Sequence, residues 1–392
     1  LNFMSDLKKT TYRAAITYNN KINAKNKLQV GLKYALFDYD FEQSHIQGDS
    51  DERTTLVDFK EQVGTIRGFA SWKHRLNDDI TIVSGIHNMN VLYNKKYAIE
   101  PRLAMNWRLD GTNSIHAGYG LHSTMESIHN YFAKVENAAG ELAEPNKDLG
   151  LLKAHHFVAG YKKQFSKNLM AKVELYYQHL YDLPVENLDT SYYATINEGL
   201  EFRYVDLVNK GTGKNFGVEF TLERFLHRNF YYILNGSVYN STYKTLDGNE
   251  RNTAFNGQYL VNFLIGKEFV NLGRQKNKSL SLNAKVFYGG GRKYIPLLRD
   301  ADGNLAVDPA NGRFWDYDKA YDDKLDDLFQ FTVSASYKIN KQRVTHEFYL
   351  NIDNVTNSMG RMTEYYDERE PGKVGYVKQF GMFPNLIYRI YF

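Results

Sequence analysis

The chain of 392 residues contains no cysteine, so neither a disulfide framework nor a thiolate metal site can form. No stretch approaches the ~20 apolar residues that a membrane-spanning helix needs, which excludes a helical membrane protein. Its 49 basic and 45 acidic residues leave a net charge of +4, too balanced to predict a nucleic-acid partner. Residues 1–9 lack the basic and apolar regions of a signal peptide. We therefore expect that a signal was removed or that the chain is part of a longer one.

Aromatic residues are abundant, and proline is scarce. Tyrosine occurs 31 times and phenylalanine 24 times, against 7 prolines. With 43% hydrophobic and 15% aromatic residues the chain can bury ample surface, so it is not a disordered chain. This composition predicts many strands rather than helices.

Apolar and polar residues alternate with a period of two in many segments, which is the pattern of half-buried strands. In the clearest segment one face carries Phe329, Phe331, Val333, Ala335 and Tyr337. We predict about fifteen strands, many of them close to the ~9–11 residues of a tilted membrane strand. Their expected cores are residues 10–20, 27–40, 62–75, 79–92, 97–109, 113–123, 154–165, 168–181, 214–226, 229–243, 257–270, 278–292, 328–340, 344–353 and 383–392.

The connections between these strands alternate in length. Short segments rich in Asn, Asp, Gly and Lys, typical of hairpin turns, lie at 19–26, 76–79, 110–113, 165–168, 226–229, 271–277 and 340–343. Long polar segments lie at 41–61, 123–153, 183–213, 293–328 and 354–383. Short turns at one end and long loops at the other are typical of outer-membrane barrels. We predict an all-β fold, a transmembrane antiparallel up-and-down β-barrel with short periplasmic turns and long extracellular loops, as one unit over residues 1–392.

The two faces of the expected strands differ in charge. A lysine or arginine that faces lipid at the midplane costs ~2–4 kcal/mol, so the uncharged apolar faces are expected to meet lipid. The opposite faces are expected to line the lumen; they carry Arg102, Arg108, Lys172, Glu174, Glu219 and Glu223. A soluble, aromatic-rich β-sandwich is the alternative, but a sandwich has no reason to alternate short and long connections.

The last strand ends in a distinctive way. Leu386, Tyr388, Ile390 and Phe392 share one face, and Phe392 is the final residue of the sequence. A terminal Phe with apolar residues two and four positions before it resembles the C-terminal assembly signal of outer-membrane barrels. Tyr388, Ile390 and Phe392 are therefore expected to be recognised by the barrel assembly machinery.

Several segments resemble TonB-dependent outer-membrane receptors. The most specific is Phe348-Tyr349-Leu350-Asn351-Ile352-Asp353-Asn354-Val355-Thr356-Asn357, followed by Gly375-Tyr376 and by Phe383-Pro384-Asn385 before the C-terminus. Residues 101–103 with 114–120, 174–178 with 183–185, and 217–223 also resemble strands of this family.

The resemblance implies a 22-stranded barrel, a plug domain inside it, and a segment near the N-terminus that binds TonB. About fifteen strands is fewer, and an odd number does not close a typical bacterial barrel. Neither a plug nor a TonB-binding segment is recognisable in this sequence. We therefore expect the C-terminal part of a larger barrel in the outer membrane of a Gram-negative bacterium, with the TonB complex contacted through a missing N-terminal part.

The function implied by the resemblance is active uptake of a scarce nutrient, such as a metal chelate, a cofactor, a glycan or a peptide. Loops on a rigid scaffold carry specificity, so the loops at 123–153, 183–213 and 293–328 are expected to contact it. The aromatic residues predicted to bind substrate are Tyr192, Tyr193, Trp315, Tyr317 and Tyr321. Expected partners besides TonB are outer-membrane lipid and a surface lipoprotein. The alternatives are a passive porin-type channel and an accessory barrel that binds a partner protein.

No motif of catalysis or of metal binding stands out. The Gly-x-Ser-x-Gly elbow and the zinc-protease helix motif are absent, so we expect no enzyme. Adjacent His155 and His156 would face opposite sides of a strand, whereas His116 and His122 would lie about 20 Å apart. Residues 300–304 are similar to the start of a calcium loop, but their spacing differs from an EF-hand, so a solvated turn is expected there, with a weak external Ca²⁺ site as the alternative. We predict no cofactor and no metal site.

Overall fold

The computed structural model describes the chain except residues 1–2, 47–52, 137–138, 199–202, 308–313 and 367–372. In this part of the chain the helical elements are one turn of α-helix, α1 (Ile128–Tyr131), and three 3-10 turns, η1 (Pro145–Asp148), η2 (Thr195–Asn197) and η3 (Tyr317–Lys319). None of the helices among the described residues is long and apolar enough to cross a membrane. Almost all regular structure is β-strand.

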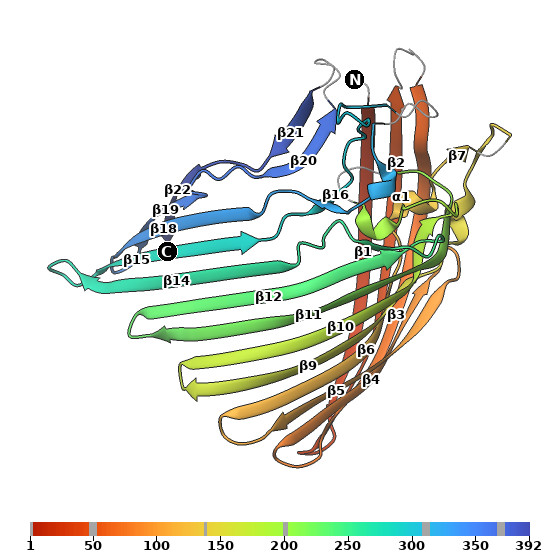
Figure 1. The fold of residues 1–392 in the computed structure, drawn as a ribbon. Helices are drawn as coiled ribbons and strands as arrows, with labels where there is room; N and C mark the ends of the chain where they lie inside the picture. The colour runs from red at the N-terminus through yellow and green to blue at the C-terminus, as the bar shows by residue number, and fades with distance from the viewer. Residues whose placement is uncertain (1–2, 47–52, 137–138, 199–202, 308–313, 367–372) are drawn as a thin grey trace.

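Fifteen long strands pair in chain order, each antiparallel to the next, and form one curved sheet that fans from β1 to β22 (Figure 1). These strands are β1 (Phe3–Lys21), β2 (Asn26–Ile46), β3 (Arg53–Arg75), β4 (Ile80–Val91), β5 (Tyr97–Arg108), β6 (Asn113–Thr124), β9 (Leu152–Ser166), β10 (Leu169–Glu186), β11 (Leu207–His227), β12 (Phe230–Lys244), β14 (Tyr259–Leu272), β15 (Lys278–Gly289), β18 (Leu328–Asn340), β19 (Thr345–Asp353) and β22 (Phe383–Tyr391). A sixteenth strand, β13 (Glu250–Asn252), pairs with β12. The predicted strands and the predicted all-β, antiparallel, up-and-down order are confirmed.

The short connections are hairpin turns whose residues satisfy the local backbone. Between β11 and β12, Arg228 and Asn229 both have positive φ, 53° and 61°, as a two-residue type I′ turn requires. In two other turns, the side-chain oxygens of Asn77 and Asp110 accept backbone N–H groups two and three residues ahead, at 2.6–2.9 Å. These Asx turns explain why Asn and Asp recur at this end of the sheet.

The long connections contain more regular structure than we expected. The predicted loop at 41–61 is largely a strand hairpin, because β2 continues to Ile46 and β3 begins at Arg53. Likewise β10 continues to Glu186 and β11 begins at Leu207, so the predicted loop at 183–213 is shorter than expected. Three small hairpins occupy the other loops: β7 (Val135–Glu136) with β8 (Leu142–Ala143), β16 (Lys293–Tyr294) with β17 (Asp323–Lys324), and β20 (Arg361–Tyr366) with β21 (Val374–Lys378). The strands of these small sheets are two to six residues long, too short to carry an alternation from which they could be predicted.

The two faces of the sheet separate by polarity as expected. On one face large apolar side chains remain exposed, for example Leu175 at 54%, Val218 at 44% and Leu350 at 40%. On the other face polar and charged side chains pair across strands, as where His116 Nε2 lies 2.7 Å from Glu174 Oε1. An apolar face of this kind left open to the surroundings is what a lipid-facing wall requires.

Three consecutive glycines join the sheet to its loops: Gly289 is the last residue of β15, and Gly290 and Gly291 follow it. A Cβ on Gly290 would collide with the backbone carbonyl of Gly257, and one on Gly291 would collide with that of Leu325. Gly290 and Gly291 therefore permit close approach between the backbones of neighbouring segments.

We expect Gly290→Ala to lower the stability of the loop end by about 1–3 kcal/mol, the usual cost of forcing extra atoms into packed structure. Gly111→Ala is the matched control, because no atom lies within 4 Å of its added Cβ. Denaturant unfolding of the purified protein checks this, and equal midpoints for the two variants would contradict it.

Candidate ligand-binding site formed by the long loops

The long loops fold together into a buried core at one end of the sheet, where α1 lies beside the strand ends (Figure 1). Tyr131 and Phe132 at the end of α1 are each 1% exposed. Phe132 stacks on Phe59 of β3 with ring centroids 4.2 Å apart, and Tyr93 packs against its ring at 5.1 Å. The loops are thereby attached to the rigid strands that carry them.

A cluster of tyrosines around one arginine joins the loop at 183–213 to the loop at 293–328. The rings of Tyr192 and Tyr317 stack with centroids 4.8 Å apart, and Tyr321 meets Tyr192 edge-on at 6.3 Å. The guanidinium of Arg203 lies 5.4 Å from the ring of Tyr192, 5.1 Å from Tyr193 and 6.0 Å from Tyr317. Cation–π contacts of this kind grow stronger as water is excluded.

Arg203 is also fixed by directed polar contacts. Its Nη1 donates to the hydroxyl of Tyr192 at 3.0 Å, and its Nη2 forms an ion pair with Glu186 at 3.2 Å. Tyr243 of β12 donates its hydroxyl to the backbone carbonyl of Tyr192 at 2.7 Å. The Tyr–Arg cluster is therefore anchored both to its own loop and to the wall of the sheet.

Four of the five aromatic residues predicted to bind substrate meet in this Tyr–Arg cluster. Tyr192 and Tyr193 are 8% and 6% exposed and form part of the buried core, whereas Tyr317 and Tyr321 are half-buried. Trp315 lies apart from them, in a β-bridge with Leu297. Arg203 was not predicted, because nothing in the linear sequence shows that it would lie among these rings. A ligand would reach the half-buried rings of Tyr317 and Tyr321 more readily than the two buried tyrosines.

Two half-buried carboxylates lie beside the Tyr–Arg cluster and join it to α1. Glu198 accepts hydrogen bonds from the hydroxyl of Tyr193 at 2.6 Å and from Asn130 Nδ2 at 3.0 Å, and His129 Nε2 lies 3.3 Å away. Glu126 accepts a hydrogen bond from the hydroxyl of Thr195 at 2.7 Å. Through these contacts the loop at 123–153 is joined to the loop at 183–213.

The pKa values of the two carboxylates are shifted in opposite directions. Burial raises the pKa of Glu126 above its ordinary value of 4.5, and the nearby charge of Glu198 adds to the rise. Burial opposes the ionisation of Glu198 as well, but the hydrogen bonds from His129 and Tyr193 outweigh it and lower its pKa. Protonated Glu126 and ionised Glu198 therefore coexist at pH values between the lowered pKa of Glu198 and the raised pKa of Glu126.

From these shifts we expect the loop core to lose stability as the pH rises from about 4.5 through the raised pKa of Glu126. In that pH range the folded state keeps a proton on Glu126 that the unfolded state has lost. The stability that this proton contributes is lost once Glu126 ionises. Glu126→Gln keeps an acceptor for Thr195 and should flatten this dependence. Hydrogen exchange of the amides of residues 128–131 between pH 5 and 7 measures it.

Glu198→Gln is the matched control for this experiment, because it removes a carboxylate whose pKa is lowered. It should weaken the loop core at pH 7, where the wild-type group is ionised, and the exchange of the same amides should become faster. If both variants left the pH dependence of exchange unchanged, the assignment of opposite roles to the two carboxylates would be wrong.

A second polar region lies on the inner face of the sheet below these loops. His87, Arg102, His122, His156 and Gln178 border a cavity of about 410 Å³. Arg102 Nη2 pairs with Glu100 at 2.7 Å, and the hydroxyl of Ser123 donates to the same carboxylate at 2.6 Å. This arrangement places hydrogen-bond donors and a fixed cation around one cavity of the inner face.

The histidines lie as the alternation predicts. His155 packs on the apolar side with Tyr119, and its neighbour His156 faces His122 with ring centroids 4.5 Å apart. The His122–His156 pair comes from adjacent strands, so spacing along the sequence did not reveal it. Among the residues that the structure describes, no group of three or more His, Asp or Glu side chains could hold a metal ion.

The segment similar to a calcium loop is a turn. Asp300 Oδ1 accepts the backbone N–H of Asp302 at 3.0 Å and that of Asn304 at 2.8 Å, and Gly303 has φ +83°. A bridge between Arg299 and Leu305 closes this turn. The carboxylate therefore satisfies the turn's own backbone, as the Asp-Gly turn interpretation requires.

The predicted assembly signal lies on β22 and at its end. Tyr388 and Ile390 are on the apolar face, 52% and 40% exposed, and Phe392 follows the strand almost fully exposed. On the other face, buried Glu347 of β19 accepts hydrogen bonds from Tyr391 at 2.6 Å and Ser336 at 2.6 Å, and pairs with Arg389 at 3.0 Å. This network ties the last strand to its neighbour, and alternation alone did not indicate it.

Comparison with known proteins identifies the family of this fold. The family model described as TonB dependent receptor-like, beta-barrel matches residues 2–355. The chain therefore belongs to the TonB-dependent receptor-like β-barrel family, whose members are receptors and transporters of the Gram-negative outer membrane. The search of curated proteins gives no match.

Solved receptors share the fold at low sequence identity. The chain is similar to Pseudomonas aeruginosa FpvA in complex with iron and pyoverdine, at TM-score 0.63 and 11% identity over 99% of this chain and 48% of FpvA. It is similar to the ferric yersiniabactin uptake receptor FyuA from Yersinia pestis, at TM-score 0.63 and 11% identity over 100% of this chain and 56% of FyuA. The copper transporter OprC matches at TM-score 0.62 and 12% identity, over 99% of this chain and 58% of OprC. The chain thus spans about half the length of these receptors.

Proposed function

We propose that the chain supplies barrel wall and extracellular loops to an outer-membrane transporter that takes up a scarce nutrient actively, with energy relayed by TonB. Membership of the receptor family supports the class of function. The observation that carries the proposal is the folded loop core, in which the Tyr–Arg cluster presents the half-buried rings of Tyr317 and Tyr321.

The nutrient class suggested by similar structures is a metal chelate or a metal ion. FpvA and FyuA are described with ferric siderophores, and OprC is described as a copper transporter. A ferric chelate offers a large surface with aromatic or anionic groups, and the tyrosine rings and Arg203 provide complementary chemistry. TonB, the barrel assembly machinery and a surface lipoprotein are the proposed protein partners.

Uptake by cells that produce the full-length receptor tests active transport. Cells are supplied with radiolabelled ferric pyoverdine, ferric yersiniabactin or copper, with and without an uncoupler of the proton gradient. We expect accumulation of one of them that the uncoupler abolishes. Accumulation that is insensitive to the uncoupler, together with steady ion conductance of the purified protein in a bilayer, would support the passive porin-type channel instead.

The aromatic residues can be tested in a binding assay. We expect joint replacement of Trp315, Tyr317 and Tyr321 by Ala to weaken binding of the transported ligand by tenfold or more, about 1.4 kcal/mol, because the accessible ring faces are lost. Tyr12→Ala removes an equally large ring from the apolar face of β1, away from the loops, and should leave binding unchanged. Titration of the purified receptor by intrinsic fluorescence measures both, and equal affinities would disprove the role of these rings.

A further inference from the structure

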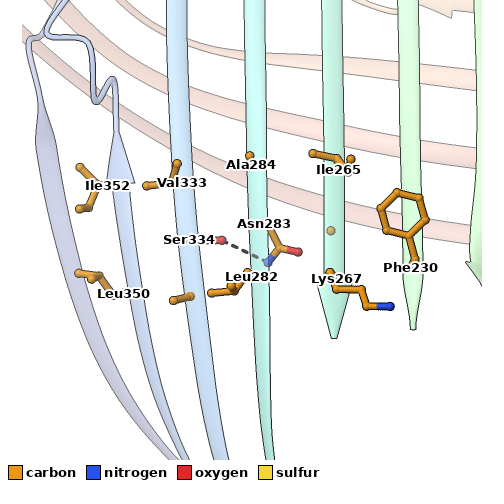
Figure 2. A pocket seen from close by; sticks show the side chains of 12 residues that line it. Phe230, Ile265, Lys267, Leu282, Asn283, Ala284, Val333, Ser334, Leu350 and Ile352 are labelled. Carbon is orange, nitrogen blue, oxygen red and sulfur yellow. Dashed lines mark hydrogen bonds between the residues drawn. The ribbon is translucent and has the colours of Figure 1, made fainter. Parts of the chain in front are cut away.

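We propose that the apolar face near the short turns holds a specific binding site for one anionic glycerophospholipid. The site is a groove across β12, β14, β15, β18 and β19 with a volume of about 440 Å³ (Figure 2). This inference goes beyond nutrient uptake and requires only that the apolar face meets lipid.

The groove has the shape and lining that an acyl chain needs. Its sides are formed by Phe230, Ile265, Leu282, Val333, Leu350 and Ile352. Between them Ala284 and Ala335, on adjacent strands, provide a lower floor because their side chains are small. Large side chains around small ones make a depression that a flexible apolar chain can fill by dispersion contacts.

One cation lies within this apolar groove. Lys267 of β14 is aligned with Phe230 on one neighbouring strand and Leu282 on the other, and Figure 2 shows it beside that phenylalanine. Its Nζ reaches toward the short turn and donates to the backbone carbonyl of Arg228 at 3.3 Å. A lysine that faces lipid extends its amine toward the headgroups, so Lys267 presents its charge where a lipid headgroup would lie.

The turns around the groove provide further positive charge with no acid among them. The connections at 226–229, 271–277 and 340–343 carry Arg228, Arg274, Lys276, Lys341 and Arg343, and none contains Asp or Glu. The neighbouring acid on β14, Glu268, points to the opposite face, where the hydroxyl of Ser281 donates to it at 3.4 Å. Basic clusters at a membrane surface attract anionic headgroups, so the charge complements a phospholipid whose headgroup is net negative rather than a zwitterionic one.

A second groove on the same face shows that apolar lining alone does not create this arrangement. It has a volume of about 600 Å³, is lined by Leu103, Met105 and Leu175 with small Ala117 and Ala159, and contains no charged residue in its lining. On the face of β9 that carries Ala159, the nearest cation is Lys163, four residues away, about 13 Å along the strand. The turns at that end also include acids, such as Asp79 and Asp110. This second groove is the natural control.

Native mass spectrometry of the full-length receptor in detergent, titrated with dioleoylphosphatidylglycerol or dioleoylphosphatidylcholine, tests the proposal. We expect the wild type to retain one phosphatidylglycerol about fivefold more tightly than phosphatidylcholine, the factor that one surface cation typically contributes. Lys267→Gln should abolish this preference. Ala284→Phe, which fills the groove, should remove the retained lipid of either kind.

Ala159→Phe fills the second groove and should behave as the wild type. Migration of unheated samples in denaturing gels confirms that each variant keeps a compact barrel. Glycerol 3-phosphate, which has a headgroup phosphate but no acyl chain, should not displace the bound lipid. Equal retention of the two lipids by the wild type, retention unchanged in both groove variants, or displacement by glycerol 3-phosphate would overturn the proposal.

Discussion

Backbone hydrogen bonding in lipid is the constraint on which this structure depends. No water is available there to satisfy an exposed N–H or C=O group, so a strand that crosses the bilayer must pair with a neighbour on each side. Thirteen of the fifteen long strands pair on both sides in sequence order, whereas β1 and β22 lie at the two edges of the sheet and pair on one side each. Once the strands are paired, side chains alternate between two faces, and all further chemistry is divided between a lipid-facing wall and an inner surface.

The inner surface and the loops solve a different problem, which is to bury polar groups without losing their partners. Glu347 and Glu100 are almost fully buried, and each accepts hydrogen bonds from neighbouring strands. In the loops, Glu198 and Arg203 are surrounded by tyrosines that provide both apolar surface and hydroxyl partners. A buried charge with several partners rigidifies its surroundings, so a ligand would meet a preformed surface rather than flexible loops.

The lipid-facing wall is not uniform either. Small residues beside large ones leave grooves, and only one of the two grooves compared above includes a lysine in its lining. The alternation of polar and apolar residues keeps one face apolar, but the size and charge of the side chains on that face still vary from place to place. Individual lipids can therefore bind with different affinities at different places. Transport and lipid binding would use opposite faces of the same strands.

The sequence by itself determined the strands, their antiparallel order and the polarity of their faces, because all three follow from local alternation and from turn residues such as Asn77 and Asp110. The same alternation placed His155 and His156 on opposite faces. The prediction from alternation failed at 41–61, because polar side chains at the ends of β2 and β3 do not distinguish strand from loop. It also could not reveal contacts between segments far apart in the chain.

Only the tertiary structure decided which residues meet. Arg203 lies among Tyr192, Tyr193 and Tyr317 because two loops fold against each other, and no local pattern records that distance. The pairing of His122 with His156 and the groove around Lys267 depend in the same way on strand register. Alternation is a property of one strand, whereas a site is a property of several segments brought together by packing.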